Sequence, residues 1–251
     1  MTAATRIYFA SDMHLGAPDP ESSLAREKRL VRWLKEVGED ATEIHLLGDV
    51  LDFWFEYGKA VPKGFVRLFG TLAELSDRGV GIYWYLGNHD MWLFDYLPEE
   101  LGVKVLDGPV ERVWGDKRFY IAHGDGLGPG DHGYKFLKKV FRNRLCQWLF
   151  ARIHPNLGIR IAQFFSSSSR THSVSGQSGG FLGDDKEWLM IHSREVHGKD
   201  PHDYYVYGHR HLPMMKELKG GGCYVNLGDW IHSYSYGLFD GEKFQLLTYS
   251  K

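Results

Sequence analysis

Short apolar runs that end abruptly in polar clusters recur along this chain of 251 residues. One run, Ile44–Leu47, ends at Gly48-Asp49, and an apolar segment of that length suits a buried strand. Because the arrangement occurs five times in all, it predicts strand ends that converge on one polar site, where open α/β sheets place their ligands. The other four expected strands are Arg6–Ala10, Ile82–Leu86, Phe119–Ala122 and Tyr204–Tyr207.

Helical periodicity separates the first three of these strands. Apolar residues recur near helical spacing over Glu21–Val37 and Lys63–Arg78, and Gly79 suits a C-terminal cap. A strand-helix-strand-helix-strand order predicts an α/β fold with a substantially parallel sheet. Later in the chain we expect a helix over Asp184–His197, a strand over Cys223–Leu227, and a hairpin of Tyr234–Phe239 with Lys243–Tyr249.

The middle of the chain departs from this order. An apolar stripe over Tyr134–Ile153 predicts one helix, and Leu157–Phe165 predicts a second, short one. The Ser- and Gly-rich stretch that follows, Ser166–Gly183, reads as a loop. We therefore expect a single domain spanning 1–251, with residues 132–183 inserted as a helical lid over the polar site.

Charge is distributed unevenly around a net value of −2. The predicted insert, from His132 through Gly183, holds eight Lys and Arg and no Asp or Glu, whereas the rest of the chain is net acidic. A basic, amphipathic unit of this kind is suited to an anionic partner, either a phosphorylated substrate or an anionic membrane surface. Nothing in the pattern points to nucleic acid, and the oligomeric state stays open.

The rest of the composition places the chain in a broad class. With 43% hydrophobic and 15% aromatic residues the chain has enough apolar side chains for a large core. Two cysteines, Cys146 and Cys223, have neither disulfide-framework nor zinc spacing, which favours a reducing compartment. The first residues lack the apolar region of a signal peptide, and no stretch is long and apolar enough to span a bilayer. We expect a cytoplasmic protein, with peripheral membrane contact as an option.

The polar clusters have the composition of a metal site. Mixed Asp, His and Asn without Cys favour Mn²⁺, Fe²⁺ or Zn²⁺. Asp49, just beyond a buried strand, is the candidate carboxylate bridging two ions roughly 3.5–4 Å apart, a pair that activates water and braces a phosphoryl group. In Asp12-x-His14 and His209-x-His211, strand alternation would place both side chains on one face.

Five short motifs, D-x-H, GD-x-x-D, GNHD, HGD and GHRH, stand in an order that resembles the calcineurin-like metallophosphoesterase family. The resemblance implies a four-layer sandwich of two mixed β-sheets flanked by helices. It implies two divalent metal ions, of which we expect manganese, with iron and zinc as alternatives. His89 would be the general acid, oriented by Asp90. The implied ligands are Asp12, His14, Asp49 and His211 for one ion, and Asp49, Asn88, His123 and His209 for the other.

Within that family the chain most resembles the diphosphatases that act on UDP-2,3-diacylglucosamine in lipid A synthesis. The DMHLG start, the GDVLDFW run, the basic insert and the closing LGDW carry this likeness. It implies hydrolysis of a pyrophosphate by water attack on the α phosphorus, giving UMP and a diacylated sugar phosphate, with the insert as acyl-chain lid. Substrate contacts are expected from Asn88, His89, Asp131, Tyr134, Arg160 and Arg170.

One position departs from that subfamily, whose best-known members carry Arg where this chain has His89. Imidazole can donate a proton to a leaving group, whereas Arg supplies only fixed charge. Two other interpretations therefore accompany the lipid pyrophosphatase: a soluble phosphodiesterase or nucleotidase, and a metal-free scaffold, which the full set of ligands disfavours. Asp90 could instead cap a helix, and Asp52 and Asp229 could either support the site or end local structure. The other histidines read as structural.

Overall fold

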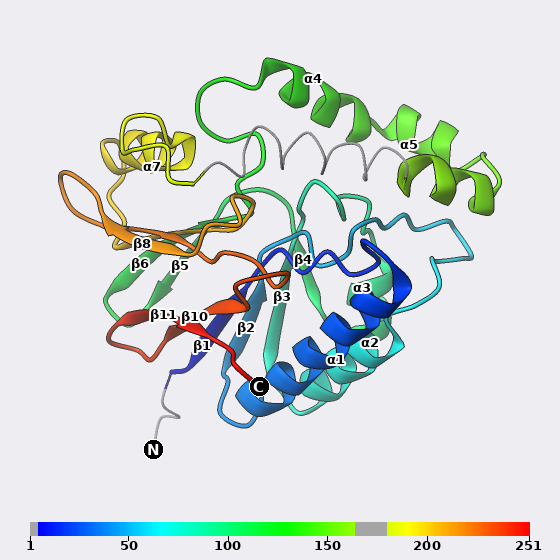
Figure 1. The fold of residues 1–251 in the computed structure, drawn as a ribbon, viewed down its shortest axis with the longest axis horizontal. Helices are drawn as coiled ribbons and strands as arrows, with labels where there is room; N and C mark the ends of the chain where they lie inside the picture. Colours follow the sequence, from blue (N-terminus) through cyan, green and yellow to red (C-terminus); the bar gives the residue numbers. More distant parts are fainter. Residues whose placement is uncertain (1–4, 164–179) are drawn as a thin grey trace.

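The computed structural model describes residues 5–163 and 180–251, which form two β-sheets packed face to face between helices (Figure 1). The first sheet has the order β11-β10-β1-β2-β3-β4 and the second β5-β6-β7-β9-β8. The strands are β1 (Ile7–Ala10), β2 (Glu43–Leu46), β3 (Gly81–Tyr85), β4 (Lys104–Leu106), β5 (Val110–Trp114), β6 (Lys117–Ala122), β7 (Tyr204–Tyr207), β8 (Met214–Glu217), β9 (Cys223–Asn226), β10 (Ser235–Phe239) and β11 (Phe244–Thr248).

Both sheets are mixed, as expected from the resemblance. In the first, β1 to β4 run parallel, while β10 pairs antiparallel with β1 and with β11. In the second, β6, β7 and β9 run parallel between antiparallel edge strands β5 and β8. The carboxyl ends of the parallel strands open on one region, because parallel neighbours end at the same edge of a sheet. The predicted fold class is confirmed.

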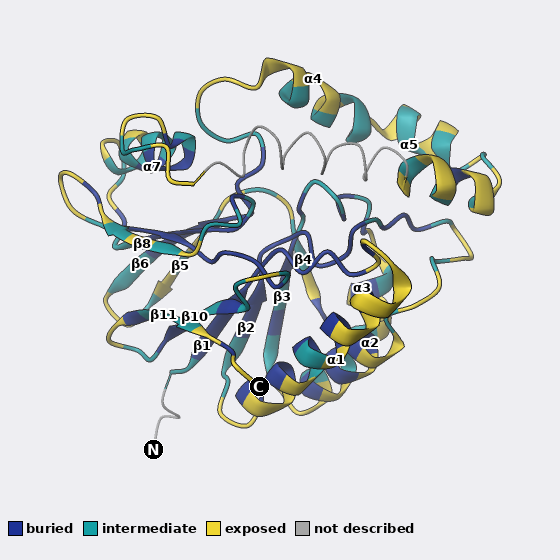
Figure 2. Ribbon diagram, in the orientation of Figure 1, coloured by how far each residue is buried: buried dark blue, intermediate teal, exposed yellow. Residues whose placement is uncertain are grey.

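Three hydrophobic clusters hold these layers together. Between the sheets lie Phe9, Phe119 and Phe239, all fully buried. Trp33 on α1 (Pro20–Val37) and Leu72 on α2 (Val66–Asp77) belong to a cluster on the outer face of the first sheet. The helix α7 (Trp188–His197) covers the outer face of the second sheet in the same way. Figure 2 shows the buried strands between helices that are exposed on their outer sides.

Element boundaries follow the sequence pattern closely where buried apolar residues are regular. The predicted strands start or end within two residues of the observed ones, whereas the helices expected from Lys63 and Asp184 begin later, at Val66 and Trp188. The short strands β4, β5 and β8 and the helix α3 (Tyr96–Leu101) were not predicted. Apart from the buried Leu97 of α3, their positions are exposed or intermediate, and none of these elements has a continuous apolar run.

The insert lies between β6 and α7 and forms a separate arch above the strand ends (Figure 1). Its predicted single helix is wrong: the chain breaks after α4 (His132–Phe141), and Asn143 caps α5 (Arg144–Phe150) by accepting from two backbone N–H groups. A third helical stretch, 155–163, follows. No residue of α4 or α5 is buried. Arg170 and most of the loop predicted at Ser166–Gly183 lie outside the described residues.

Candidate metal centre

The predicted ligands come together where strands of both sheets end. Asp12, Asp49 and Asn88 follow β1, β2 and β3 of the first sheet, while His123 and His209 follow β6 and β7 of the second. Apart from Asn88, the predicted ligands fall, together with His89, into three groups whose ligand atoms lie within 4.8 Å of one another, and Asp49 belongs to two of these. The groups are Asp12, His14 and His211; His14, Asp49 and His89; and Asp49, His123 and His209.

Five of these side chains stand on a left-handed backbone. The φ angles are 58° at Asp12, 44° at His14, 51° at Asp49, 65° at His209 and 52° at His211. The expectation that strand alternation aligns Asp12 with His14, and His209 with His211, is therefore wrong: each strand has already ended, and tight turns aim the side chains. Positive φ is uncommon for residues other than glycine, and such strain collects at functional sites.

Glycines allow the turns to pack against each other. A Cβ atom at Gly48 would lie 2.7 Å from Nδ1 of His123 and 2.8 Å from the backbone of Gly87. A Cβ at Gly208 would collide with Ser11 and Asp12 on the loop after β1. Only glycine fits at these contacts, so the Gly beside each polar cluster sets how closely the loops approach.

Backbone amides fix one oxygen of each central carboxylate. The N–H of His209 donates to Oδ2 of Asp12 at 2.8 Å, and the N–H of His89 donates to Oδ1 of Asp49 at 2.8 Å. The second oxygen of each carboxylate faces imidazole: Oδ1 of Asp12 lies 3.2 Å from Nε2 of His211, and Oδ2 of Asp49 lies 3.3 Å from Nε2 of His123. In each carboxylate, one oxygen is thus held by a backbone N–H and the other faces the ligand groups.

The tautomer of His123 follows from its other nitrogen. Nδ1 lies 2.6 Å from the carbonyl oxygen of Leu47, which can only accept, so Nδ1 carries the hydrogen. Nε2 of the neutral ring then directs a lone pair at Oδ2 of Asp49 and at Oδ1 of Asn88, 3.3 Å away. Three such atoms facing one another suit either a second proton on Nε2 or a metal ion, and this backbone contact is the usual support of a metal-binding histidine.

The first group has the same character. Nε2 of His14 lies 3.3 Å from Nε2 of His211, and Oδ1 of Asp12 is buried without a hydrogen-bond partner. A carboxylate oxygen and two imidazole nitrogens that face one another fit a divalent transition metal. The residues present therefore fit two metal ions, with Asp49 between the groups.

Burial and the short distances between these charged groups shift the pKa values of several ligands. Burial and the positive charge of His123 lower the pKa of His209 to about 4, which keeps its ring neutral. Burial opposes ionisation of Asp12, yet His211 and His123 lower its pKa to about 2. Burial also opposes a charge on His123, but the Asp49 and Asp12 carboxylates raise its pKa to about 10. A proton on His123 thus supplies positive charge that a bound metal would replace.

Asp90 has a different environment from the one expected. Its carboxylate accepts hydrogen bonds from the backbone N–H groups of Asp49, Val50 and Gly87 and from the indole of Trp84. These contacts tie the loop after β3 to the loop after β2, which carries Asp49. Asp90 therefore positions the backbone of Asp49, the predicted bridging carboxylate.

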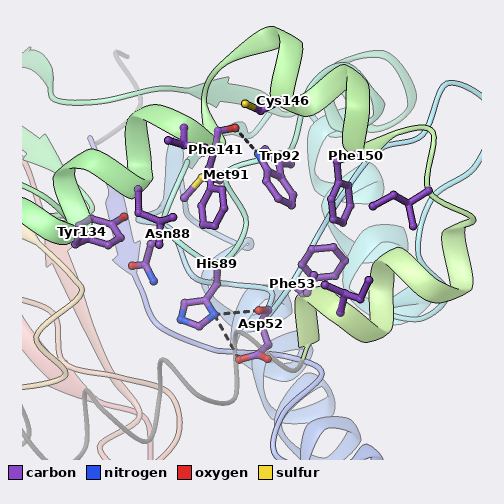
Figure 3. Close-up of a pocket in the computed structure, with 15 residues that line it drawn as sticks. Asp52, Phe53, Asn88, His89, Met91, Trp92, Tyr134, Phe141, Cys146 and Phe150 are labelled. Atoms are coloured by element: carbon purple, nitrogen blue, oxygen red, sulfur yellow. Dashed lines mark hydrogen bonds and ion pairs between the residues drawn. The ribbon is translucent and has the colours of Figure 1, made fainter.

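Asp52 takes the orienting place beside His89. Nδ1 of His89 donates to the carbonyl oxygen of Asp52 at 3.0 Å and lies 3.7 Å from its carboxylate (Figure 3). The same carboxylate lies 3.4 Å from Nδ1 of His14. Of the two interpretations of Asp52, supporting residue or simple turn, the structure favours support, because one side chain lies against two imidazoles of the centre.

An apolar pocket of about 530 Å³ adjoins the metal centre. Its polar end is formed by Asp52, Asn88 and His89, and Figure 3 shows these side chains on the floor beneath the insert. Its walls come from the Phe53 and Trp92 loops and from the insert. The insert residues that line it are Tyr134, Leu137, Val140, Phe141, Cys146, Phe150, Ile153, Ile161 and Ala162.

The predicted substrate residues are placed unequally. Tyr134 lines the pocket, whereas Asp131 is an exposed N-cap of α4 that accepts from the Tyr134 backbone N–H. Arg160 is exposed on the helical stretch 155–163. Sequence reasoning missed Asp125, which is buried and accepts from the hydroxyl of Tyr134 at 2.5 Å while pairing with Lys138 at 2.5 Å. Its place in the HGD motif was the available signal.

Two contacts outside the donor groups support the loops after β7 and β9. Arg210, between His209 and His211, forms a buried ion pair with Glu187 at 2.7 Å. Asp229 accepts from the backbone N–H groups of residues 231–233 and lies 3.9 Å from Nδ1 of His211. Asp229 thus both ends the local structure and lies beside the site, so the two interpretations of this residue are compatible.

The chain is similar in sequence to a family of known proteins. The family model for calcineurin-like phosphoesterase matches residues 5–213. A UDP-2,3-diacylglucosamine hydrolase of Porphyromonas gingivalis is 38% identical, covering 94% of this chain and 95% of the relative. One of Edwardsiella ictaluri is 29% identical, covering 88% and 83%. Among solved structures, the phosphoesterase Yfce of E. coli is 18% identical with a TM-score of 0.48, covering 97% and 93%.

Proposed function

The chain belongs to the calcineurin-like phosphoesterase family and is a metal-dependent hydrolase, and on that premise we propose that it cleaves the pyrophosphate of UDP-2,3-diacylglucosamine. The products would be UMP and 2,3-diacylglucosamine 1-phosphate. Relatives that share most of their length with this chain carry the name of that hydrolase.

The observation that carries the proposal is the pocket between the insert and the metal centre. Its volume of about 530 Å³ lies in the range of ligand sites. One end presents His89 and Asn88, and the rest is formed mainly by apolar side chains of the insert, such as Leu137 and Phe150. A molecule that joins a phosphate group to acyl chains matches both ends, because burial of each methylene contributes about 0.8 kcal/mol.

The donor groups define how the chain would hold its metals. Asp12, His14, Asp49 and His211 would hold one ion, and Asp49, Asn88, His123 and His209 the other. When bound, such a pair supplies an activated water and charge stabilisation for a phosphoryl group. Manganese is our choice among manganese, iron and zinc, and all three suit Asp, His and Asn ligands.

His89 would supply the proton for the leaving group. Because Nδ1 donates to the Asp52 carbonyl, Nε2 of the protonated ring would be the atom that donates to a leaving oxygen in the pocket. Asn88, next to it, would contact the same phosphate. Tyr134 lies at the polar end of the insert, so its ring would lie against the substrate. Asp131, Arg160 and Arg170 stay as predicted substrate contacts without support from the geometry.

The insert would also contact an anionic membrane surface. Phe136 and Leu145 are 70% and 64% exposed, and Trp148 and Leu149 are more than half exposed. They lie among the eight cations of the acid-free stretch, and exposed apolar side chains flanked by Lys and Arg suit an interfacial position. No helix among the described residues is long and apolar enough to cross a membrane.

A comparison of two substrates tests the proposal. We expect the purified chain with Mn²⁺ to hydrolyse UDP-2,3-diacylglucosamine with a kcat/KM far above that for bis-p-nitrophenyl phosphate, which carries no acyl chain. The variant Leu137→Ser should lower kcat/KM for UDP-2,3-diacylglucosamine, because Leu137 lines the apolar part of the pocket. Its kcat/KM for bis-p-nitrophenyl phosphate should stay that of the wild type. Equal, slow hydrolysis of both would instead support a soluble phosphodiesterase or nucleotidase, which His89 also suits.

A further inference from the structure

A second cluster of metal-ligand side chains lies at the other end of the strands that carry the catalytic centre. Glu111 is on β5, and Asp200 and His202 precede β7. His123 and His209, by contrast, follow the carboxyl ends of β6 and β7. Ligand atoms of Glu111, Asp200 and His202 lie within 4.8 Å of one another. This cluster belongs to no part of the proposed catalytic machinery.

The histidine of this cluster has one nitrogen without a partner. The side chain of His202 is fully buried, and Nε2 makes no hydrogen bond. Nδ1 lies 2.8 Å from the carbonyl oxygen of Asp200, which can only accept, so Nδ1 carries the hydrogen. In the neutral ring, Nε2 therefore carries a lone pair that no hydrogen-bond donor satisfies.

That lone pair faces two carboxylates. Nε2 of His202 lies 3.6 Å from Oε2 of Glu111 and 4.0 Å from Oδ2 of Asp200. Both distances exceed a hydrogen bond, so a proton on Nε2 would not join these atoms. They are close to the spacing of roughly 3.4 Å between two ligands on a tetrahedral ion with bonds of about 2.1 Å. An ion between the three atoms would satisfy the nitrogen and both carboxylates.

We propose that Glu111, Asp200 and His202 form a structural site for one divalent transition metal ion, such as Zn²⁺. One imidazole and two carboxylates are common zinc ligands, with water completing the four-coordinate shell. Glu111 and Asp200 have side chains 56% and 48% exposed, which leaves an entry path from solvent. The backbone contact to Nδ1 fixes the ring as it does in established metal sites.

Arg118 shares these carboxylates without filling the site. Its guanidinium pairs with both oxygens of Asp200, at 2.6 and 2.7 Å, and lies 3.5 Å from Glu111. Each carboxylate oxygen has two lone pairs, so Oδ2 of Asp200 can accept from Arg118 and also bind a metal. Two negative charges and one positive charge leave a net charge of −1, which attracts a divalent cation.

The bound ion would fasten an edge of the second sheet. Glu111 is on the edge strand β5, whereas Asp200 and His202 lie on the connection from α7 to β7. Joining segments about 90 positions apart stabilises the folded state, because the ion binds only when they are together. Catalysis would not depend on it.

Counting bound zinc tests this site in the full-length protein. We expect equilibrium dialysis against Zn²⁺ to give one more equivalent for the wild type than for His202→Asn, and Zn²⁺ to raise the thermal midpoint more in the wild type. His192→Asn is the matched control, because His192 contacts Tyr120 nearby but lies outside the cluster. It should bind as many equivalents as the wild type.

A second variant keeps the test interpretable if His202→Asn, which changes a buried side chain, fails to fold. Glu111→Gln changes an exposed side chain and should weaken the additional zinc site by at least about tenfold, with the rate of phosphoester hydrolysis unchanged. Equal zinc stoichiometry in the wild type, His202→Asn and Glu111→Gln would overturn the proposal. That outcome would leave the catalytic proposal intact, because the two sites use different residues.

Discussion

Individual side chains of the metal centre were predictable because their chemistry is visible in the sequence. Asp12, Asp49 and His123 stand at the ends of apolar runs, the last two beside glycines, and the structure brings them together. Their backbone was not predictable, because no periodic pattern encodes the left-handed φ of Asp12 or Asp49. The partner of His89 was missed for a related reason: Asp52 lies 37 positions away, whereas the expected Asp90 is adjacent.

The division of labour between Asp49 and His89 leads to contrasting variants. Asp49→Ala is expected to lose bound metal and all turnover, because Asp49 belongs to two ligand groups and its removal leaves two cations facing each other. His89→Ala should keep its metal and slow hydrolysis by roughly 10²–10⁴-fold, the usual contribution of a general acid. Metal content by mass spectrometry and steady-state kinetics measure both. Full activity of His89→Ala would refute its proton-donating role.

Another buried histidine, His45, predicts how stability depends on pH. Nε2 donates to Glu43 at 2.9 Å and Nδ1 accepts from the hydroxyl of Tyr85 at 3.1 Å, which describes a neutral ring. Burial lowers the pKa of His45, although Glu43 opposes this shift. Histidine in the unfolded chain titrates near pH 6.5. Below that pH the unfolded state binds more protons, so the free energy of unfolding falls as pH decreases.

Urea unfolding at pH 7.5, 6.5, 5.5 and 5.0 measures this contribution. Below pH 6.5 His45 is expected to contribute a slope of up to about 1.4 kcal/mol per pH unit. His45→Gln keeps a polar side chain that does not titrate, so its slope should be smaller by about one proton. Identical slopes for the two proteins would show that His45 does not remain neutral in the folded state.

At the scale of elements, the regular buried strands and helices followed from the sequence and the insert did not. The stripe over Tyr134–Ile153 looked like one helix with a core face, yet α4 and α5 are separate and contribute no buried residue. Periodicity reports an apolar face without saying whether protein, ligand or solvent covers it. Here that face lines a pocket in part and is exposed in part.

With so little buried surface, α4 depends on polar anchors. Lys138, largely buried, pairs with the carboxylate of Asp125 and donates to its carbonyl at 2.9 Å, whereas the neighbouring Lys139 is exposed. Asp125 in turn follows His123 by two residues, so this contact joins the insert to the loop that carries a predicted ligand. Loss of such a charge-assisted bond weakens local structure by about 1.5–3 kcal/mol.

Lys138→Met and Lys139→Met therefore form a matched pair. We expect Lys138→Met to raise the KM for UDP-2,3-diacylglucosamine by about tenfold, because α4 forms a wall of the pocket, with hydrolysis of bis-p-nitrophenyl phosphate changed less than about twofold. Lys139→Met should leave both values near those of the wild type. Equal effects of the two variants would mean that charge in general, and not the Asp125 anchor, affects substrate binding.

For the whole molecule, the two-sheet architecture was inferred from a family resemblance and not from periodicity. Apolar runs predicted strands, but they did not reveal that β1 and β6 belong to different sheets. Both strands bury Phe side chains in the cluster between the sheets, so their apolar patterns look alike in the sequence. The separation of charge was readable directly, because the acid-free stretch 132–183 is continuous in sequence. It concentrates cations on the same insert that exposes apolar side chains.

This joint placement predicts binding to anionic lipid vesicles. Each Lys or Arg near an anionic surface contributes about 1 kcal/mol, and the attraction is screened by salt. Burial of Trp148 and Leu149 in the interface adds about 1.5–3 kcal/mol for each. We therefore expect the chain to co-sediment at low salt with vesicles containing phosphatidylglycerol. It should bind weakly to vesicles of phosphatidylcholine alone, and should dissociate as salt is raised.

Substitutions separate the apolar contribution from the charge. The double variant Trp148→Ser/Leu149→Ser keeps every cation of the insert, so any loss of affinity belongs to the apolar side chains, and we expect at least about tenfold. Val113→Ser is the control, because Val113 is 63% exposed on the edge strand β5, outside the insert. If the double variant and Val113→Ser bind anionic vesicles equally well, the insert attracts lipid by charge alone. Its exposed apolar face would then serve the substrate and not the membrane.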